Sequence, residues 1–244
     1  MARRFFVSND CIFDNQLKII GAEHNHISRV LRLAVGENIA VSTYNGDEYE
    51  CEIIEIKKDY TLANIQSKKV ALKPEVEITL FQAIIKGEHM DWCVQKCTEL
   101  GVTKIVPFVS NFTTVKQSDN KQERLMRVAI EACKQSGRAV VPEITAILTF
   151  NQVLAQLKEY EQIIVAFEQE TAPAKDVISK LTKTKKVALI VGSEGGFSKN
   201  EVEQFIKLGA KSICMGKNIL RAETASVALL SAVLYELGEW KNEK

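Results

Sequence analysis

The chain has 244 residues, of which 46% are hydrophobic and 26% charged, and its 32 basic side chains almost balance its 31 acidic ones. This composition describes a globular protein with one or two buried cores and excludes a disordered or fibrous chain. No apolar run reaches the roughly 18 residues of a membrane-spanning helix, and the opening MARRFFVSND lacks the apolar centre of a secretory signal.

Cysteine and histidine patterns exclude several kinds of site. The six cysteines follow no framework spacing, so we expect free thiols in a cytoplasmic protein. Only three histidines are present, and neither CxxC nor HExxH occurs. We therefore expect no metal site and no Ser–His–Asp centre.

The first 73 residues predict short strands and one helix. Strands are expected at 3–7, at 16–20 and three times within 38–66, and a helix at 23–33. Asn45-Gly46 between two β-rich runs predicts a tight hairpin. We therefore expect a small β-rich barrel domain over residues 1–73, which ends where Lys73-Pro74 interrupts the pattern.

From residue 74 onward, strands and helices alternate. Strands are expected at 76–84, 104–110, 161–167, 185–192 and 212–216, and helices at 90–100, 121–135, 150–158, 173–182, 199–208 and 223–240. Pro107 suggests that its strand lies at an edge or ends there. The alternation predicts an α/β domain over 74–244, with a mostly parallel sheet covered by helices on both faces.

A glycine-rich loop follows the apolar run VALIVG. It reads Ser-Glu-Gly-Gly-Phe over 193–197, and Ser198 with Glu201 fits a capping box that starts a helix. The loop matches neither GxGxxG nor a P-loop, which disfavours dinucleotide and triphosphate sites. It is either a tight strand-to-helix turn or a loop whose backbone approaches a ligand.

A second loop, at 216–221, follows the next strand. Ile219 and Leu220 are apolar where polar residues are usual, so they either plug the core or wall an apolar pocket. Arg221 enters a helix N-terminus, whose dipole disfavours a cation. This placement predicts a partner for Arg221, such as Glu223, Glu194 or a bound anion.

Basic residues cluster locally although the total charge is near zero. The clusters are Arg3 with Arg4, Arg29 with Arg32, and the mostly basic stretches 115–138 and 207–221. Such clusters either contact phosphates or form an ordinary solvated surface.

Six motifs in order carry a resemblance to a known family. They are RRFFV at 3–7, HISRVLRLAVG at 26–36, KCTELGVTKIVP at 96–107, a set ending in ACKQSGR and VPEI within 123–144, GSEGGFS at 192–198 and ILRAETA at 219–225. From end to end the chain resembles the RsmE family, the 16S rRNA (uracil(1498)-N(3))-methyltransferases of the SPOUT class. Ser193 stands where this family commonly has proline, which affects little beyond the stiffness of the turn.

The resemblance implies a fold and a set of partners. It implies a PUA-like RNA-binding barrel at 1–73 and, at 74–244, a SPOUT methyltransferase domain whose C-terminal part is tied in a trefoil knot. It further implies S-adenosylmethionine as cofactor, a homodimer, and 16S rRNA within the 30S subunit as substrate. The closing helix, through Val227, Leu230, Leu234 and Leu237, either packs on the core or forms the dimer contact.

The resemblance also implies a cofactor site. The expected binding residues are Phe167, Glu168, Gly192, Ser193, Glu194, Gly195, Gly196, Met215, Gly216, Asn218, Ile219, Leu220 and Thr224. The expected catalytic residues are Arg221, Glu223 and Arg138. Glu223 or Glu194 is the candidate acceptor for the N3 proton of uridine, although either can equally be a carboxylate that stabilises a helix start. No histidine lies in these loops, so a histidine base is not expected.

RNA contacts are expected on other parts of the chain. The expected residues are Arg3, Arg4, Arg29, Arg32, Lys134, Gln135 and Arg138. Phe5 and Phe6 either stack on bases or are buried strand aromatics. Two other functions stay open: an RNA-binding module without catalysis, and an enzyme that acts on a phosphorylated small molecule through an anion nest.

Overall fold

The structure is a computed structural model that describes residues 3–44, 46–70, 74–114, 121–181 and 184–240. The chain divides into two compact units. One takes residues 1–73 together with Ile130–Val141, and the other takes Pro74–Ala129 and Pro142–Lys244. The end of one long helix and the loop after it thus group with the N-terminal residues.

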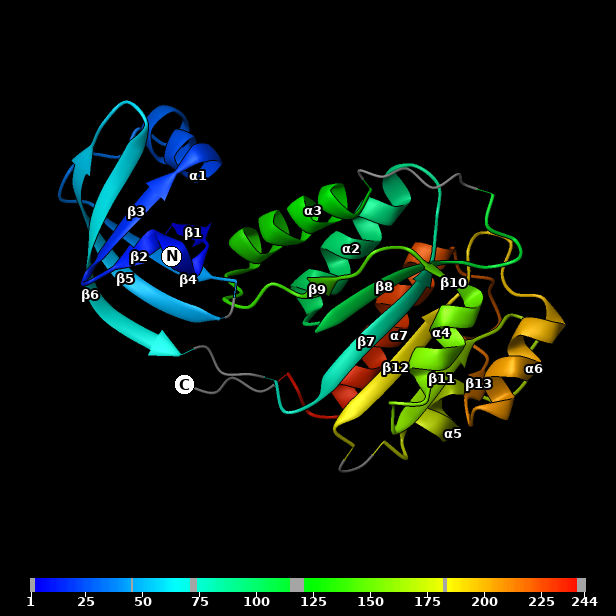
Figure 1. The fold of residues 1–244 in the computed structure, drawn as a ribbon. Helices are drawn as coiled ribbons and strands as arrows, with labels where there is room; N and C mark the ends of the chain where they lie inside the picture. Colours follow the sequence, from blue (N-terminus) through cyan, green and yellow to red (C-terminus); the bar gives the residue numbers. More distant parts are fainter. Residues whose placement is uncertain (1–2, 45, 71–73, 115–120, 182–183, 241–244) are drawn as a thin grey trace. The chain divides into compact units, whose positions relative to one another are not determined.

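The first unit is built on a six-stranded sheet (Figure 1). Its order is β1 (Arg4–Val7), β4 (Asn38–Thr43), β5 (Asp47–Ile56), β6 (Tyr60–Val70), β3 (Gln16–Ile20) and β2 (Ile12–Phe13). Only β1 and β4 pair in parallel, and the other neighbours are antiparallel. The predicted strands of this β-rich unit are confirmed.

The hairpin between β4 and β5 forms as its sequence predicts. Ser42 pairs with Glu48, and the Gly46 N–H donates to the Thr43 carbonyl at 3.0 Å. Gly46 has a φ of 92°, which glycine adopts without steric cost. Asn45, the other half of the predicted turn, lies outside the described residues, as does Lys73 of the predicted domain boundary.

The predicted helix at 23–33 is shorter and less regular than expected. After a 3-10 turn, η1 (Asn9–Cys11), and strand β3, the chain forms α1 (Gly21–Asn25) and then a π-helical turn, η2 (His26–Val30). Arg32 has a φ of 51°, in the left-handed region, so the helix cannot continue through it.

Phe5 and Phe6 belong to the interior of this unit. Phe5 is fully buried among Leu17, Ile19 and other core side chains, and Phe6 is 1% exposed. Base stacking by these two aromatics is therefore wrong, and the alternative of buried strand residues is confirmed.

The second unit contains a parallel sheet. Its order is β10 (Leu148–Thr149), β8 (Lys104–Val109), β7 (Glu77–Ala83), β12 (Lys186–Val191), β11 (Gln162–Ala166) and β13 (Lys211–Ile213), with β9 (Glu143–Ile144) also beside β8. Every described strand pair in it is parallel. The predicted mostly parallel α/β sheet is confirmed.

Helices cover both faces of this sheet (Figure 1). They are α2 (Glu88–Leu100), α3 (Lys121–Ser136), α4 (Phe150–Leu157), α5 (Ala174–Ile178), α6 (Lys199–Lys207) and α7 (Ala222–Glu236). On one face, Val153 of α4 and Phe205 of α6 share a core with Phe81 and Val106 of the strands. On the other, α7 packs against α2, β7 and β12.

Pro107 lies inside the sheet rather than on an edge strand, so the expectation of an edge is wrong, and it lies near rather than at the end of β8, which runs to Val109. Its strand, β8, has β7 on one side and two short strands on the other. β9 pairs with residues 104–105 of β8, and β10 pairs with residues 108–109. Pro107 therefore sits in the gap between the two short strands, where its missing N–H interrupts no continuous ladder.

The closing helix packs on the core, which was one of its two expected roles, and the cysteines are free thiols as expected. In α7, Leu230 and Leu234 are buried in the core, whereas Val227 and Leu237 are half-buried. All six cysteines are free thiols. No helix among the described residues is long and apolar enough to cross a membrane.

Candidate functional site

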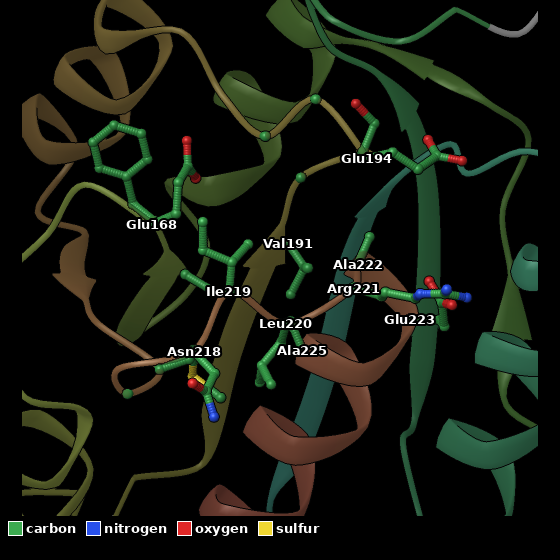
Figure 2. Close-up of a pocket in the computed structure, with 18 of the residues that line it drawn as sticks. Glu168, Val191, Glu194, Asn218, Ile219, Leu220, Arg221, Ala222, Glu223 and Ala225 are labelled. Carbon is green, nitrogen blue, oxygen red and sulfur yellow. The ribbon is translucent and has the colours of Figure 1, made fainter.

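A cavity of about 740 Å³ opens at the carboxyl ends of three neighbouring strands. Its walls are the segment 166–168 after β11, the glycine loop 191–196 after β12, and the segment 214–225 that follows β13 and enters α7. Figure 2 shows side chains from all three segments around it. Ligands of open α/β sheets bind at this kind of edge.

Three glycines shape the loop after β12, because side chains there would meet other atoms. A Cβ on Gly196 would lie 2.9 Å from the Glu168 carboxylate oxygens, and one on Gly195 would lie 2.8 Å from Phe112 Cβ. A Cβ on Gly192 would lie 3.0 Å from the Gly196 backbone. Gly196 also has a φ of 67°, and its N–H donates to the Ser193 carbonyl at 2.9 Å. The loop is therefore held in one compact conformation.

The predicted capping box at the start of α6 is confirmed. The Glu201 backbone N–H donates to Ser198 Oγ at 3.3 Å, and the Ser198 backbone N–H donates to Glu201 Oε2 at 2.9 Å. Glu201 is almost fully buried, and its other oxygen accepts the Asn111 backbone N–H at 2.8 Å. The segment after β8 is thus anchored to the helix that follows the glycine loop.

A buried amide holds the other end of the glycine loop. Gln82, on β7, donates through Nε2 to the carbonyls of Ala83 at 2.9 Å and Gly192 at 3.0 Å. Its Oε1 accepts hydrogen bonds from Ser226 of α7 and Cys93 of α2. One buried side chain therefore links the central strand, the pocket loop and two helices, and a fully satisfied polar network of this kind is rigid.

The second loop forms the opposite wall of the cavity. Ile219 is 86% exposed and lines the cavity together with Leu220, as Figure 2 shows. Core packing of Ile219 is therefore wrong, and the alternative of an apolar pocket wall fits its position. Gly216, with a φ of 114°, turns the chain after β13.

Arg221 does not have the carboxylate partners expected for it. It is the exposed N-cap residue of α7, and among the described residues it forms no ion pair. Glu194 instead accepts the Lys86 backbone N–H at 2.8 Å, and Glu223 contacts His89 Nδ1 at 3.0 Å. A bound anion remains as the expected partner of Arg221.

A histidine lies in the cavity although none lies in its loops. His89 comes from the first turn of α2, whose strand β7 neighbours β12. The signal in the sequence is its position: residue 89 lies between the predicted strand 76–84 of the same parallel sheet and the helix predicted after it, and this connection is at the same edge. The cavity lining also includes seven other residues that were not expected, namely Lys86, Ala166, Val191, Cys214, Lys217, Ala222 and Ala225.

The structure brings most of the expected cofactor residues together. The lining contains Phe167, Glu168, Gly192, Ser193, Glu194, Gly195, Gly196, Met215, Gly216, Asn218, Ile219 and Leu220, and also Arg221 and Glu223. Thr224 is exposed on the first turn of α7 and is not part of this lining. Arg138 is not part of it either and belongs to the other compact unit.

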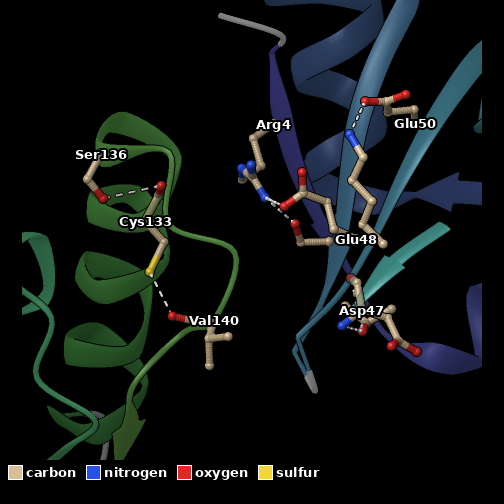
Figure 3. Close-up of polar contacts among 10 residues, drawn as sticks. Arg4, Asp47, Glu48, Glu50, Cys133, Ser136 and Val140 are labelled. Atoms are coloured by element: carbon tan, nitrogen blue, oxygen red, sulfur yellow. Dashed lines mark hydrogen bonds and ion pairs between the residues drawn. The ribbon is translucent and has the colours of Figure 1, made fainter. Parts of the chain in front are cut away.

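The expected RNA-binding residues all belong to the first unit. Arg3, Arg29, Arg32 and Gln135 are exposed. Arg4 instead pairs with Glu48 at 2.6 Å, as Figure 3 shows. It also donates to Ser42 Oγ. Lys134 is held between Glu23 at 2.7 Å and Glu131 at 2.8 Å.

Arg138 and Lys134 differ from the exposed arginines in their surroundings. Burial lowers the pKa of the Arg138 guanidinium from its usual value. The pKa of Lys134 is raised despite burial, because hydrogen bonds to Glu131 and Glu23 favour its charged form. Both cations are therefore embedded in the unit, and only the exposed set is immediately available to a phosphate.

Comparisons with known proteins place the chain in a family. Residues 72–234 match the family model described as an RNA methyltransferase domain, and residues 19–66 match an RNA methyltransferase PUA domain. The chain belongs to this RNA methyltransferase family. It is 30% identical over 228 residues to ribosomal RNA small subunit methyltransferase E of Bacillus subtilis, and the match covers 89% of each chain.

Solved structures agree with this assignment. A ribosomal RNA small subunit methyltransferase E from Neisseria gonorrhoeae bound to S-adenosyl methionine superposes with a TM-score of 0.89. It is 27% identical, and the match covers 99% of this chain and 100% of that one. A methyltransferase from Legionella pneumophila in complex with the bound cofactor SAM gives a TM-score of 0.87 at 27% identity, over 96% and 98% of the chains.

The cavity has the chemistry that a ligand such as S-adenosylmethionine needs. Ser193 lines the cavity and is 5% exposed, and its Oγ has no hydrogen-bond partner within the described structure. Ile219 and Leu220 offer an apolar surface for an adenine, and the glycine loop offers close backbone approach. The carboxylates of Glu168 and Glu194 complement the cationic groups of such a donor.

Proposed function

We propose that this protein is an S-adenosylmethionine-dependent methyltransferase that methylates N3 of a uridine in 16S rRNA, of the m3U1498 type, in the small ribosomal subunit. The observation that carries the proposal is the cavity at the carboxyl edge of the sheet, in which the GSEGGFS and ILRAETA segments face each other. The names of the matched relatives, which are small subunit rRNA methyltransferases, support the same substrate.

Residues of the three loops hold the cofactor in this proposal. Ile219, Leu220 and Met215 border the adenine, and the Asn218 side chain and the backbone of Gly216 offer it polar contacts. The other proposed binding residues, which border the ribose and methionine parts, are Phe167, Glu168, Gly192, Ser193, Glu194, Gly195 and Gly196. When bound, S-adenosylmethionine supplies an electrophilic methyl group. The chain holds the acceptor uridine in line with that group, which accounts for much of the acceleration.

Arg221 is proposed to stabilise the uracil as its charge becomes negative. Its guanidinium lies at the cavity without a carboxylate partner among the described residues, so it is available to an anionic oxygen. Glu223 and Glu194 are proposed to assist removal of the N3 proton, directly or through a neighbouring side chain, and Arg138 is proposed to help hold the substrate. Thr224 remains a proposed cofactor contact although it does not border the cavity.

The first domain, residues 1–73, is proposed to bind RNA, and residues 74–244 to catalyse. Arg3, Arg29 and Arg32 are exposed and suited to phosphates. Gln135 lies in the same compact unit. Arg4, Lys134 and Arg138 act from within this unit, where carboxylates or burial already fix their side chains. The target base leaves its stack to reach the methyl group.

Four further properties are part of the proposal. The C-terminal loops form a trefoil knot, the protein is a homodimer, its substrate is 16S rRNA within the 30S subunit, and it works in the cytoplasm. The order β12–β11–β13 with α7 returning to pack on β12 and β7 is compatible with such a knot. Exposed Tyr235 and Trp240, near the end of α7, offer apolar surface for a second copy.

The charge of the cavity does not favour the anion-nest alternative. Three carboxylates, from Glu168, Glu194 and Glu223, border the cavity, and so do three cations, Lys86, Lys217 and Arg221. The carboxylates suit a donor that carries a sulfonium and an ammonium group.

Mass mapping of 16S rRNA tests the function. We expect 30S particles from cells that lack the gene to gain one methyl group, on uridine N3, when the protein and S-adenosylmethionine are added. Glu99→Gln is a matched control, because Glu99 forms only an exposed ion pair with Lys96 on α2. If neither the wild type nor the Glu99→Gln control adds a methyl group to the rRNA, the proposal is contradicted. Calorimetry with S-adenosylhomocysteine separates an inactive RNA-binding module, which would not bind it.

A further inference from the structure

His89 and Glu223 form a polar pair at the cavity, from residues far apart in the sequence. His89 Nδ1 lies 3.0 Å from Glu223 Oε1. The Glu223 side chain is 9% exposed, whereas the His89 side chain is 52% exposed, and both border the cavity. The pair therefore has a buried acidic end and an imidazole that is open to the cavity.

The geometry of the pair determines which imidazole nitrogen can accept a proton. Because a carboxylate only accepts hydrogen bonds, the 3.0 Å contact favours the tautomer of His89 that carries its hydrogen on Nδ1, the nitrogen next to Glu223. In a neutral imidazole the other nitrogen, Nε2, is then an acceptor with a free lone pair. A buried carboxylate that orients an imidazole in this way is the arrangement by which a histidine becomes a positioned base.

The fold supports the carboxylate end of the pair. Glu223 lies in the first turn of α7, where the helix dipole stabilises a negative charge. Since α2 and α7 pack against each other, the first turns that carry the two residues are held together. Because Oε1 of Glu223 already contacts His89, we assign Glu223 to orienting the imidazole.

We propose that His89 is the general base of the methyl transfer and that Glu223 is its positioning residue, an inference that rests on the proposed function. The uridine N3–H bond breaks and its proton goes to His89 Nε2. The N3 electron pair forms the new bond to the methyl carbon, and the carbon–sulfur pair stays on sulfur, which leaves in S-adenosylhomocysteine. His89 then returns the proton to water.

Other charged groups near His89 are less suited to this step. Lys86 and Arg221 are cations that donate hydrogen bonds, and the Glu194 carboxylate already accepts the Lys86 backbone N–H. Glu88 and Asp91 share the first turn of α2, and Asp91 is paired with Arg124.

Variants that keep one function of the imidazole test the base directly. Asparagine can still donate to Glu223 from the position of Nδ1 but provides no base, so we expect His89→Asn to slow single-turnover methylation by about 10²-fold or more. We also expect it to remove the fall in rate on the acidic side of the pH profile. Affinity for S-adenosylhomocysteine, measured by calorimetry, stays within about twofold, and added imidazole partly restores His89→Ala.

A spectroscopic measurement tests the pair without activity. The chain has three histidines, so nitrogen NMR of the imidazoles can be assigned by comparison with His89→Asn. At a pH where the ring is neutral, we expect His89 to carry its hydrogen on Nδ1 in the wild type, and to lose that preference in Glu223→Ala. An unchanged tautomer in Glu223→Ala would overturn the positioning role.

The outcomes separate this inference from the proposed function. If the wild type methylates 30S particles and His89→Asn does so at the same rate across the pH range, the inference alone is wrong. If the wild type methylates no RNA, the proposed function fails and the inference fails with it. Glu99→Gln, on the same helix, controls for a general disturbance of α2.

Discussion

The cofactor cavity and the RNA-binding unit were predicted from the same sequence with different success. The cavity is made by short contiguous segments whose backbone and small residues do most of the shaping, and nearly every residue expected there borders it. In the RNA-binding unit, two of the expected cations, Arg4 and Lys134, are engaged by internal carboxylates instead. Local sequence therefore predicts well a site that is shaped by the backbone. Whether a charged side chain is free to bind a ligand depends instead on neighbours that are distant in sequence.

The largest expected effect comes from Arg221, the cation at the cavity without a carboxylate partner within the described structure. We expect Arg221→Ala to reduce methyl transfer by about 10²–10³-fold, because it removes stabilisation of the anionic uracil. Its unfolding midpoint should remain that of the wild type, since the side chain is exposed. Near-wild-type activity on 30S particles would remove Arg221 from the reaction.

The glycine loop can be tested by a matched pair of substitutions. Gly196 and Gly209 both have positive φ, but only a Cβ on Gly196 would meet another group, the Glu168 carboxylate. We expect Gly196→Ala and Gly209→Ala each to cost about 1–2 kcal/mol of stability, from the left-handed backbone. Only Gly196→Ala should weaken S-adenosylhomocysteine binding, by tenfold or more in calorimetry, and equal binding by both variants would show that the loop does not shape the site.

The RNA-binding unit can be tested by comparing exposed and engaged arginines. We expect Arg29→Ala with Arg32→Ala to weaken RNA binding, and the slope of log affinity against log salt to fall by about 0.7 for each phosphate that is no longer neutralised. Arg4→Ala should instead lower stability, because it leaves Glu48 without its partner. Filter binding at several salt concentrations and thermal unfolding measure the two effects. An unchanged salt slope in the Arg29 and Arg32 double variant would contradict the proposed RNA surface.

The smallest expected effect comes from the capping box beside the cavity. Ser198→Ala removes the acceptor for the Glu201 N–H, and we expect a loss of about 1 kcal/mol of stability. Cofactor affinity should change little, because the glycine loop is held independently by Gln82. Chemical unfolding measures the stability, and calorimetry measures the cofactor affinity. A large loss of affinity would mean that the cap, too, shapes the cavity.

Much of the fold followed from local patterns. The alternation of strands and helices, the hairpin at Gly46 and the cap at Ser198 were predicted because each depends on a few adjacent residues. The helix at 23–33 was predicted too long, because apolar spacing does not reveal the left-handed backbone at Arg32. Pro107 was expected at an edge or at a strand end because sequence does not show that the neighbouring ladder is made of two short strands with a gap.

The sequence by itself determined the two cavity loops, because turn glycines, a capping residue and apolar strands act over a few residues, and their order also carried the family resemblance. Only the tertiary structure decided which charged groups meet. His89 and Glu223 come from two helices joined by the packing of α2 on α7, and Arg4 meets Glu48 across paired strands. Contacts of this kind depend on the path of the whole chain, so the histidine that we propose as the base was absent from the residues expected at the site.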